Sequence, residues 1–391
     1  MIRYLTAGES HGQALVGIVE GVPAGLPISA EYINHQLWRR QQGYGRGGRM
    51  KIESDKVEIL SGVRFGKTLG SPIALVIRNN DWKNWYDRMA VDGDARQIKK
   101  ITIPRPGHAD YVGTVKYGYD DIRNAIERAS ARETAMRVAC CTMVRKLLEE
   151  FGMFIGSHVV GIGTALLDDR SNVDRLIRQY AKASCGAYKV TEEADKSQVR
   201  ILDKKVEAKA VDAIRRTKKL GNTLGGVFEV LITGVPLGLG SYVQYDRKLD
   251  GQLAQAVMSI HAVKGVEIGE GFGNAHKYGS EVHDEFTYKG GAIGRKTNRA
   301  GGLEAGVTNG ETIVLHGAMK PISTLAKPLQ SIDLKLKKAV KARYERSDVC
   351  AVPACSVIAE SVVAPVLANA FLEKYGGDSM KEIKTRYKRH K

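Results

Sequence analysis

A six-residue segment occurs twice in this chain with little change. Residues 21–26 read Gly-Val-Pro-Ala-Gly-Leu, and residues 234–239 read Gly-Val-Pro-Leu-Gly-Leu. Each copy follows an apolar, strand-like run, at 14–22 and 227–233, and each precedes a helical pattern. On the evidence of these six residues, we predict two related halves packed around a pseudo-twofold axis.

The other predicted elements follow one another irregularly. Hydrophobic periodicity predicts strands at 2–6, 57–60 and 73–77, the last two as a hairpin, and helices at 29–38, 121–150 and 352–375. Pro365 should interrupt the last helix, and Gly376 should end it. Because no regular strand–helix–strand alternation is present, we predict an α+β fold rather than a doubly wound sheet.

Composition is typical of a soluble globular protein. The 391 residues are 43% hydrophobic and 26% charged, which allows a large core. We find no run that is apolar for long enough to span a bilayer, and no apolar signal region at the start. The five cysteines form neither a disulfide framework nor a metal-ligand spacing. These features predict a cytoplasmic protein without a metal site.

The formal net charge of +17 calls for an explanation. One explanation is that surplus lysines lie on solvated faces and in a basic C-terminal tail at 380–391. Another is that the protein binds a polyanionic substrate or nucleic acid. The arginine- and glycine-rich segment 39–49 favours a small anion, because guanidinium groups bind phosphate and carboxylate in a bidentate manner. No aromatic-interleaved stacking platform or helix-turn-helix pattern accompanies this segment, and it lacks the ending of a Walker loop. A basic nucleic-acid-binding protein is the rival interpretation.

Two short loops each present a histidine. The loops are Gly-Glu-Ser-His-Gly at 8–12 and Arg-Pro-Gly-His-Ala-Asp at 105–110. Glycine and proline pack poorly, so we expect His11 and His108 to face a ligand, and imidazole can transfer a proton near neutral pH. The first loop also matches the Gly-x-Ser-x-Gly elbow of serine hydrolases. A strand-like run follows it instead of a helix, which disfavours that chemistry.

Further segments have the composition of ligand loops. Arg128 and Arg132 lie four residues apart on the predicted long helix, so both could face one anion, although a solvated face bridged by Glu127 or Glu133 explains the spacing equally well. Other candidate segments are a glycine-rich loop at 298–306, a cation with two hydroxyls at 320–324, and Arg-Ser-Asp at 346–348. The glycine-rich run at 265–273 lacks the context of a dinucleotide-binding site.

In their order along the chain, these motifs resemble the chorismate synthase family. The resemblance covers nearly the whole chain, with motifs at 8–12, 39–49, 105–110, 128–134, 264–269, 298–304 and 346–354. It implies a single domain over 1–391, helices sandwiched between antiparallel sheets, and a homotetramer.

The resemblance also implies a lyase reaction, the last step of the shikimate pathway. Phosphate leaves 5-enolpyruvylshikimate 3-phosphate by 1,4-elimination to give chorismate, with reduced FMN present and no net redox change. The anionic substrate and the FMN phosphate would account for the arginine loops. NADPH or an external flavin reductase would reduce the flavin, and we favour the reductase because self-reducing members are longer. A flavin enzyme with net redox turnover is a second alternative.

Residue roles follow from the same match. His11, near the substrate phosphate, and His108, near the flavin, would donate protons, and Asp348 would assist removal of the C6 proton. The candidates for binding phosphate or NADP are Arg40, Arg46, Arg49 and Arg132. The candidates for binding FMN are Arg128, Ala129, Ser130, His261, Ala262, Ala305, Lys320, Pro321, Ile322, Ser323, Thr324 and Arg346. Ala305 and His261 depart from the common family residues, glycine and asparagine, and the lysine-rich segment 176–222 receives no role.

Overall fold

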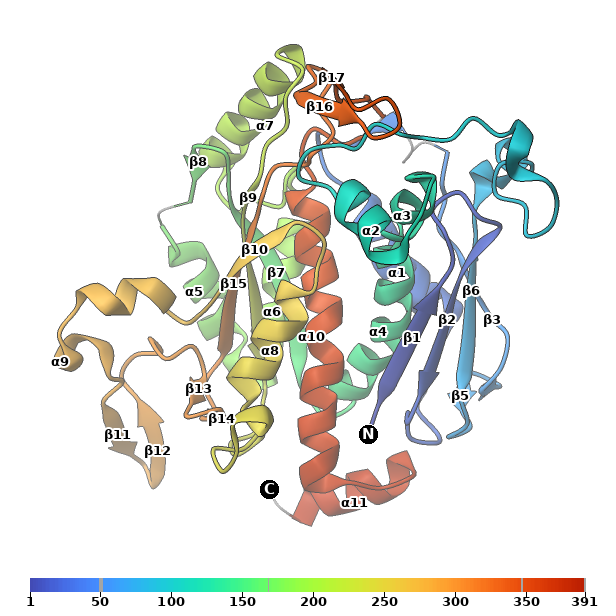
Figure 1. The fold of residues 1–391 in the computed structure, drawn as a ribbon. Coiled ribbons are helices and arrows are strands. Elements are labelled where there is room, and N and C mark those ends of the chain that lie inside the picture. Colours follow the sequence, from blue (N-terminus) through green and yellow to red (C-terminus); the bar gives the residue numbers. More distant parts are fainter. Residues whose placement is uncertain (49–51, 168, 346, 390–391) are drawn as a thin grey trace.

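Two antiparallel sheets enclose a layer of helices (Figure 1). This computed structural model describes residues 1–48, 52–167, 169–345 and 347–389. The first sheet has the order β1–β2–β6–β3, formed by Arg3–Ala7, Ala14–Glu20, Ile73–Arg78 and Val57–Ile59. The second has the order β10–β15–β9–β7–β8, formed by Val263–Ile268, Ile313–Met319, Gly226–Thr233, Phe154–Ile162 and Ala165–Leu166. The predicted α+β sandwich is confirmed, and β3 pairs with β6 as expected.

The helical layer is centred on two helices that pack side by side. These are α4 (Glu133–Glu149) and α10 (Val352–Tyr375), flanked by α1 (Ala30–Gln41) and α8 (Leu249–Met258). Gly17 of β2 lets α4 approach the first sheet, since a Cβ there would lie 2.5 Å from Cys140 Sγ. Cys140 is buried and unpaired, as expected of a small packing residue.

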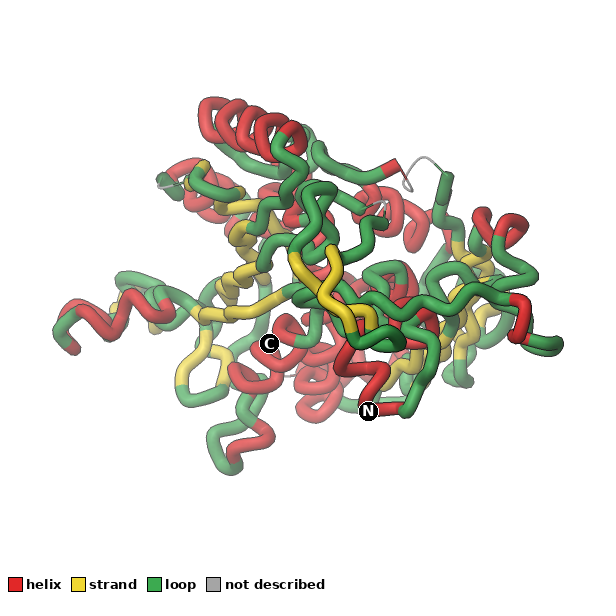
Figure 2. The backbone as a smooth tube through the Cα atoms, turned by 45° about the horizontal axis from the view of Figure 1, so that its top comes forward, coloured by secondary structure: helices red, strands yellow, loops and turns green. Residues whose placement is uncertain are grey.

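Shorter elements surround this body. The remaining helices are α2 (Asp110–Tyr117), α3 (Arg123–Arg128), α5 (Ser171–Gln179), α6 (Gly186–Ala194), α7 (Lys204–Lys219), α9 (Gly279–Val282) and α11 (Met380–Arg389). Four hairpins are formed by β4–β5 (Val63–Arg64, Lys67–Thr68), β11–β12 (Phe286–Lys289, Ala292–Arg295), β13–β14 (Leu303–Glu304, Val307–Thr308) and β16–β17 (Gln330–Asp333, Lys338–Lys341). The arm that carries α9 and β11–β12 projects from the body in both views (Figure 2).

The two halves share one topology. The order β1–β2–β6–β3 corresponds to β7–β9–β15–β10, with an equivalent hairpin before the last strand of each half. The repeated segments make the same hydrogen bonds. In each half, the hydroxyl of a hairpin threonine accepts a hydrogen bond from the backbone N–H of the leucine that ends the repeat, and it donates one to the carbonyl of the proline in the repeat. In the first half these residues are Thr68, Leu26 and Pro23. In the second half they are Thr308, Leu239 and Pro236. The prediction of two related halves is therefore confirmed.

The predicted helix at 121–150 is two helices. α3 ends at Arg128 and α4 begins at Glu133. Between them, Ser130 Oγ accepts a hydrogen bond from the backbone N–H of Arg132 at 3.3 Å, a local bond that competes with helix formation. Arg128 is exposed, whereas Arg132 is buried, so the expectation that both face one anion from one helix is wrong.

Helix α10 corrects two further expectations. It continues through Pro365 without interruption, because packing on all sides holds it in place, and it ends at Tyr375 as predicted. Its length and composition would also suit a membrane span, contrary to the sequence analysis. However, 83% of its most apolar window is buried inside the fold, so it is a core helix. The described part of the basic segment 380–391 forms α11, whose Ile383 is fully buried.

A buried carboxylate joins the helices to the second sheet. Glu360 of α10 accepts hydrogen bonds from Arg39 at 2.7 Å, from Arg145 at 2.6 Å and from Arg200 at 3.1 Å. It also accepts one from Ser157 Oγ of β7 at 2.6 Å. Burial alone would raise the pKa of Glu360, but the three guanidinium groups outweigh it and hold the pKa well below its ordinary value.

Replacing this carboxylate should destabilise the fold. Glu360→Gln leaves three buried guanidinium groups without a full counter-charge, and we expect a loss of ~3–5 kcal/mol in the free energy of unfolding. Urea denaturation at pH 7 measures it. Glu20→Gln, which breaks the exposed pair with Arg3, is the control and should cost less than ~1 kcal/mol.

The dependence on pH has a definite sign. Because the pKa of Glu360 is depressed in the folded state, its contribution is complete above the ordinary value of 4.5 and is lost as the pH falls below it. A Glu360→Gln variant whose urea denaturation midpoint equals that of the wild type would contradict this account.

Candidate active site

A cavity of about 450 Å³ opens where α4 and α10 begin. This volume lies within the range of small-molecule sites, ~300–1,000 Å³. Its polar side chains include Arg40, Arg46, His108, Thr134, His261, Lys320, Ser323 and Asp348. Its apolar side chains include Ile260, Met319, Ile322, Ala354, Cys355 and Ile358. Charged groups and an apolar wall therefore face one space.

Three cations line the cavity, two from the arginine-rich segment 39–49 and one directly after β15. Arg40, near the end of α1, donates from Nε and Nη2 to Thr134 Oγ1 at 3.0 and 2.9 Å, and burial lowers its pKa to about 10. Arg46 Nε lies 3.2 Å from Asp348 Oδ2. Lys320 donates from Nζ to the carbonyl of Gly107 at 3.0 Å, which ties it to the His108 loop. Asp348 is the only carboxylate among the cavity-lining residues that the structure describes.

His108 is held by a buried carboxylate. Its Nδ1 lies 2.5 Å from Asp110 Oδ1, and Arg105 donates to the same carboxylate from Nε at 2.8 Å and from Nη2 at 3.0 Å. Burial opposes ionisation of Asp110, but the hydrogen bonds from His108 and Arg105 prevail and keep its pKa well below the ordinary value. The carboxylate fixes the ring so that His108 faces the cavity.

His11 has the same kind of support but does not line this cavity. Its Nδ1 lies 2.9 Å from Glu127 Oε1, and its backbone N–H donates to Glu127 Oε2 at 2.7 Å. The imidazole stacks on Trp85, with ring centroids 4.0 Å apart. The side chain of Glu127 is buried, so the solvated bridge considered from the sequence is wrong.

His261 offers a polar atom without a protein partner. Its Nδ1 is buried and makes no hydrogen bond within the described part of the chain. Burial, followed by the charges of Arg137 and His108, lowers its pKa, although Glu133 opposes the shift. The shift favours the neutral form of the ring. The next residue, Ala262, has a positive φ of 67° and accepts at its carbonyl from the Lys320 N–H at 2.9 Å.

The structure gathers only part of the predicted site in the cavity. The predicted residues that line it are Arg40, Arg46, His108, Ala129, His261, Ala262, Lys320, Ile322, Ser323 and Asp348. His11, Arg128, Ser130, Arg132, Ala305, Pro321 and Thr324 do not. Arg49 and Arg346 lie outside the described residues.

Two of the predicted residues outside the cavity support loops beside it. Ser130 Oγ hydrogen-bonds to Ser10 Oγ at 3.0 Å, and Thr324 Oγ1 accepts from Arg105 at 3.2 Å. Ala305 lies in the turn between β13 and β14, with a φ of 51°.

Arg132 occupies a buried ion cluster. It donates from Nε to Asn79 Oδ1 at 3.0 Å and from Nη1 to Asp55 Oδ1. Arg40 Nη1 lies 3.5 Å from the other oxygen of Asp55. The Asp55 carboxylate thus lies between the guanidinium groups of Arg132 and Arg40. Of these two arginines, Arg40 alone lines the cavity.

Sequence reasoning missed the carboxylates that orient these groups. Asp110 belongs to a motif that we singled out, two residues after His108, and that spacing was the available signal. Glu127 lies 116 residues from His11, and Asp55 lies 77 residues from Arg132, so only the tertiary fold reveals those pairs.

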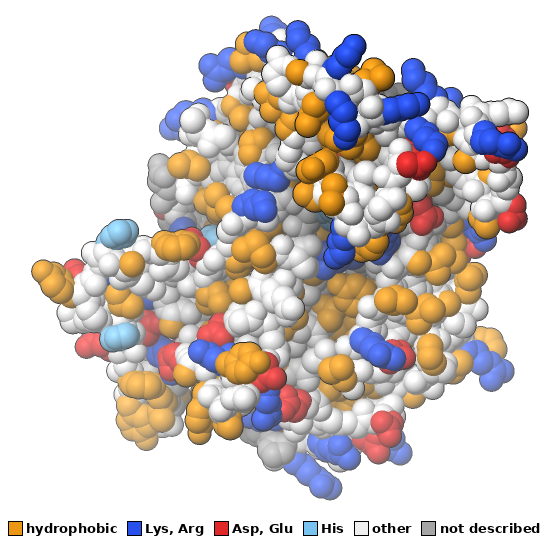
Figure 3. All heavy atoms as spheres, viewed as in Figure 1, with side chains coloured by type: hydrophobic (Ala, Val, Ile, Leu, Met, Phe, Trp, Pro, Cys, Tyr) orange, Lys and Arg blue, Asp and Glu red, His pale blue; other side chains and the backbone are white. Residues whose placement is uncertain are grey.

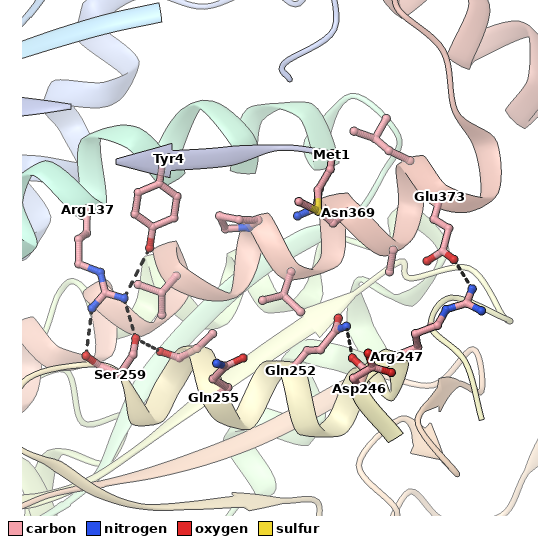
Figure 4. A pocket seen from close by; sticks show the side chains of 17 residues that line it. Met1, Tyr4, Arg137, Asp246, Arg247, Gln252, Gln255, Ser259, Asn369 and Glu373 are labelled. Carbon is pink, nitrogen blue, oxygen red and sulfur yellow. Dashed lines mark hydrogen bonds and ion pairs between the residues drawn. The ribbon is translucent and has the colours of Figure 1, made fainter. Parts of the chain in front are cut away.

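A larger cavity of about 720 Å³ lies between β1, α8 and α10 (Figure 4). Arg137 there donates to Ser259, and Arg247 pairs with Glu373 across its wall. None of the predicted site residues that the structure describes lines this larger cavity. Exposed lysine and arginine instead gather over α7, at the top of the molecule (Figure 3), consistent with a solvated outer segment.

Comparison with known proteins decides the family. A family-wide sequence profile described as chorismate synthase matches residues 2–372. The chain belongs to the chorismate synthase family. The chorismate synthase of Chlorobium phaeobacteroides (strain BS1) is 58% identical over 393 residues, which covers 100% of this chain and 98% of that protein. The chorismate synthase of Chlorobaculum tepidum is 58% identical over 389 residues, which covers 99% and 96%.

A solved structure agrees with this assignment. The crystal structure of a chorismate synthase matches with a TM-score of 0.79 at 44% identity, covering 100% of this chain and 97% of the other. The chain is accordingly a lyase of aromatic amino acid biosynthesis that acts on a small anionic substrate.

Removing Arg132 should test its place in the ion cluster. Arg132→Ala leaves the buried Asp55 without its nearest cation, and we expect a loss of ~3–5 kcal/mol in the free energy of unfolding. The dissociation constant for inorganic phosphate should change little, because Arg132 does not line the cavity. Arg96→Ala, which breaks an exposed pair with Asp94, is the control. Weakened phosphate binding with an unchanged denaturation midpoint would instead support direct contact.

Proposed function

We propose that this enzyme converts 5-enolpyruvylshikimate 3-phosphate to chorismate by 1,4-anti-elimination of phosphate, with reduced FMN and no net redox change. One observation carries the proposal. A single cavity combines the cations Arg40, Arg46 and Lys320 with His108, whose ring is fixed by a buried carboxylate. The substrate has two carboxylates and a phosphate, so its binding requires several positive groups in one place.

The residues present fit a flavin mononucleotide. The buried Nδ1 of His261 has no hydrogen-bond partner among the described residues, and a polar ring atom of a ligand would satisfy it. Ile260, Met319 and Ile358 offer an apolar wall for a flat ring system. Lys320 and Ser323 offer a cation and a hydroxyl for the phosphate. Reduced flavin, when bound, would supply electron density to the breaking C–O bond.

The remaining flavin assignments rest on the family motifs. We propose that Ala129, Ala262 and Ile322, which line the cavity, bind FMN with His261. The other proposed contacts are Arg128, Ser130, Ala305, Pro321, Thr324 and Arg346. A nicotinamide dinucleotide phosphate could meet the same cations as the substrate, and an external flavin reductase is our preferred source of electrons.

The chain's own groups would lower the barrier to phosphate loss. Arg40 and Arg46 would stabilise the negative charge that develops on the leaving phosphate, assisted by the positive ends of α4 and α10. His108 would donate a proton near the flavin, and His11 would donate one near the phosphate. Asp348 would assist removal of the C6 proton. We propose that Arg49 joins this cation group, and that Arg132 acts behind Arg40 by way of Asp55.

Assembly and location complete the proposal. One hydrophobic core contains residues from Ile2 to Tyr387, which supports a single domain over 1–391. We propose a homotetramer, as the family resemblance implies, acting in the cytoplasm.

The decisive experiment is an anaerobic assay with 5-enolpyruvylshikimate 3-phosphate and chemically reduced FMN. We expect chorismate and phosphate to appear in equal amounts, with the flavin still reduced at the end. Oxidation of one flavin per product would favour the redox alternative. A folded protein that binds reduced flavin but forms no chorismate would refute the proposed reaction.

His108 should be needed for turnover rather than for folding. We expect His108→Ala to bind oxidised FMN and to melt near the wild-type temperature, yet to lose ~10²–10⁴-fold in kcat, the usual contribution of a positioned acid or base. His283→Ala, on the projecting arm, is the control and should keep full activity. Near-normal kcat in His108→Ala would remove this residue from the mechanism.

A further inference from the structure

The two proposed proton donors have similar supports. His11 Nδ1 lies 2.9 Å from a Glu127 oxygen, and His108 Nδ1 lies 2.5 Å from an Asp110 oxygen. Both carboxylates are buried. A carboxylate at Nδ1 favours one tautomer and stabilises the imidazolium, so each histidine depends on the charge that its carboxylate can offer.

Each carboxylate is shared with an arginine. Arg123 donates from Nη1 to Glu127 Oε1 at 3.0 Å. Arg105 donates from Nε to Asp110 Oδ2 at 2.8 Å, and from Nη2 to Asp110 Oδ1 at 3.0 Å. The guanidinium group and the imidazole therefore compete for the same negative charge in both places.

The two arginines meet at one further carboxylate, Glu345. Its Oε2 lies 3.2 Å from Arg105 Nη1, and its Oε1 lies 3.6 Å from Arg123 Nη1. Arg343 also pairs with Oε1. Burial lowers the pKa of Arg343, Glu345 opposes that shift, and the charges of Arg105 and Arg123 add to it. Three cations thus converge on one partly buried glutamate.

We propose that Glu345 is a positioning residue that joins His11 and His108 into one charge network through Arg123 and Arg105. The negative charge of Glu345 partly neutralises Arg105 and Arg123. These arginines then neutralise Glu127 and Asp110 less, so the two carboxylates stabilise the protonated imidazoles more strongly. Removal of the Glu345 charge should lower the pKa of both histidines. The catalytic meaning of the network rests on the proposed function, whereas its existence does not.

Other charged groups face the two histidines and are not shared between them. Lys320 reaches the His108 loop through Gly107, and His261 lines the same cavity as His108. On the other side, Arg88 lies over Trp85, the ring on which His11 stacks. Within the described residues, Glu345 alone pairs with both Arg105 and Arg123.

Site-specific titration of the histidines tests the network. Diethyl pyrocarbonate acylates neutral imidazole, so modification rates measured against pH by peptide mass spectrometry give the pKa of each histidine. The His11 and His108 side chains are 17% and 19% exposed, within reach of the reagent. In Glu345→Gln we expect both pKa values to fall by about 0.5 pH units, less than the shift caused by a charge in direct contact.

Matched variants separate shared from local effects. Asp110→Asn should lower the pKa of His108 much more than that of His11, and Glu127→Gln should lower the pKa of His11 much more than that of His108. Glu345→Asp keeps the charge and should stay closer to wild type than Glu345→Gln. Glu58→Gln, which breaks an exposed pair with Arg78, should change neither histidine. A Glu345→Gln protein in which neither pKa moves, or only one does, would overturn the proposal.

A second variant keeps the test valid if Glu345→Gln fails to fold. Arg123→Gln removes the cation beside Glu127, so the pKa of His11 should rise. Glu345 is then shared among fewer cations and offsets Arg105 more fully, so the pKa of His108 should rise as well. A rise at His11 alone would contradict the network.

The titration and the activity assay report on different claims. If the wild-type enzyme forms chorismate, the alkaline limb of its kcat profile, where the two proton donors lose their protons, should move to lower pH in Glu345→Gln. If the wild-type enzyme forms none, the proposed function fails, while the modification rates still decide whether Glu345 links the two histidines.

Discussion

The buried carboxylate of Glu360 fixes the geometry on which the rest of the molecule depends. It holds Arg39 of α1 and Arg145 of α4 against α10, the central helix of the fold. The neighbour of Arg39 in α1 is Arg40, whose guanidinium lines the cavity. The same helices also supply the cavity floor, because α4 and α10 begin there. An ion cluster in the core therefore sets the position of a cavity-lining arginine one residue away.

The two halves share a topology but differ in what they contribute. The loop between β1 and β2 is short and carries His11, whereas the equivalent connection between β7 and β9 contains β8, α5, α6 and α7. The cavity draws His108 from the connection that follows the first sheet, and Lys320 from the end of β15 in the second. The two halves therefore differ in the side chains that their connections supply, whereas the strands and the repeated turns are common to both halves.

The sequence predicted the features that local patterns encode. Alternating and helical periodicity located the four strands of the first sheet, β9 of the second sheet, helix α10 to its residue bounds, and the repeated turns whose threonine contacts confirm the two related halves. It failed where contacts between distant residues decide. The helix predicted over 121–150 breaks between α3 and α4, where Ser130 Oγ accepts a hydrogen bond from Ser10 Oγ, 120 residues away in the sequence, besides its local bond with the Arg132 N–H. The partners of His11 and Arg132 lie too far along the chain for any spacing rule to find.

The arginines also show that local sequence patterns and tertiary contacts carry different information. In the sequence, Arg39, Arg40 and Arg46 look equivalent, since all belong to one glycine-rich segment. In the fold, Arg39 is committed to Glu360 and Asp195, whereas Arg40 and Arg46 line the cavity. Arg105 and Arg132 are likewise committed to buried carboxylates. A buried guanidinium whose charge is already met inside the protein has little left for a ligand. We therefore propose that anion binding falls to Arg40, Arg46 and Lys320, which line the cavity, rather than to the arginines of the chain as a whole.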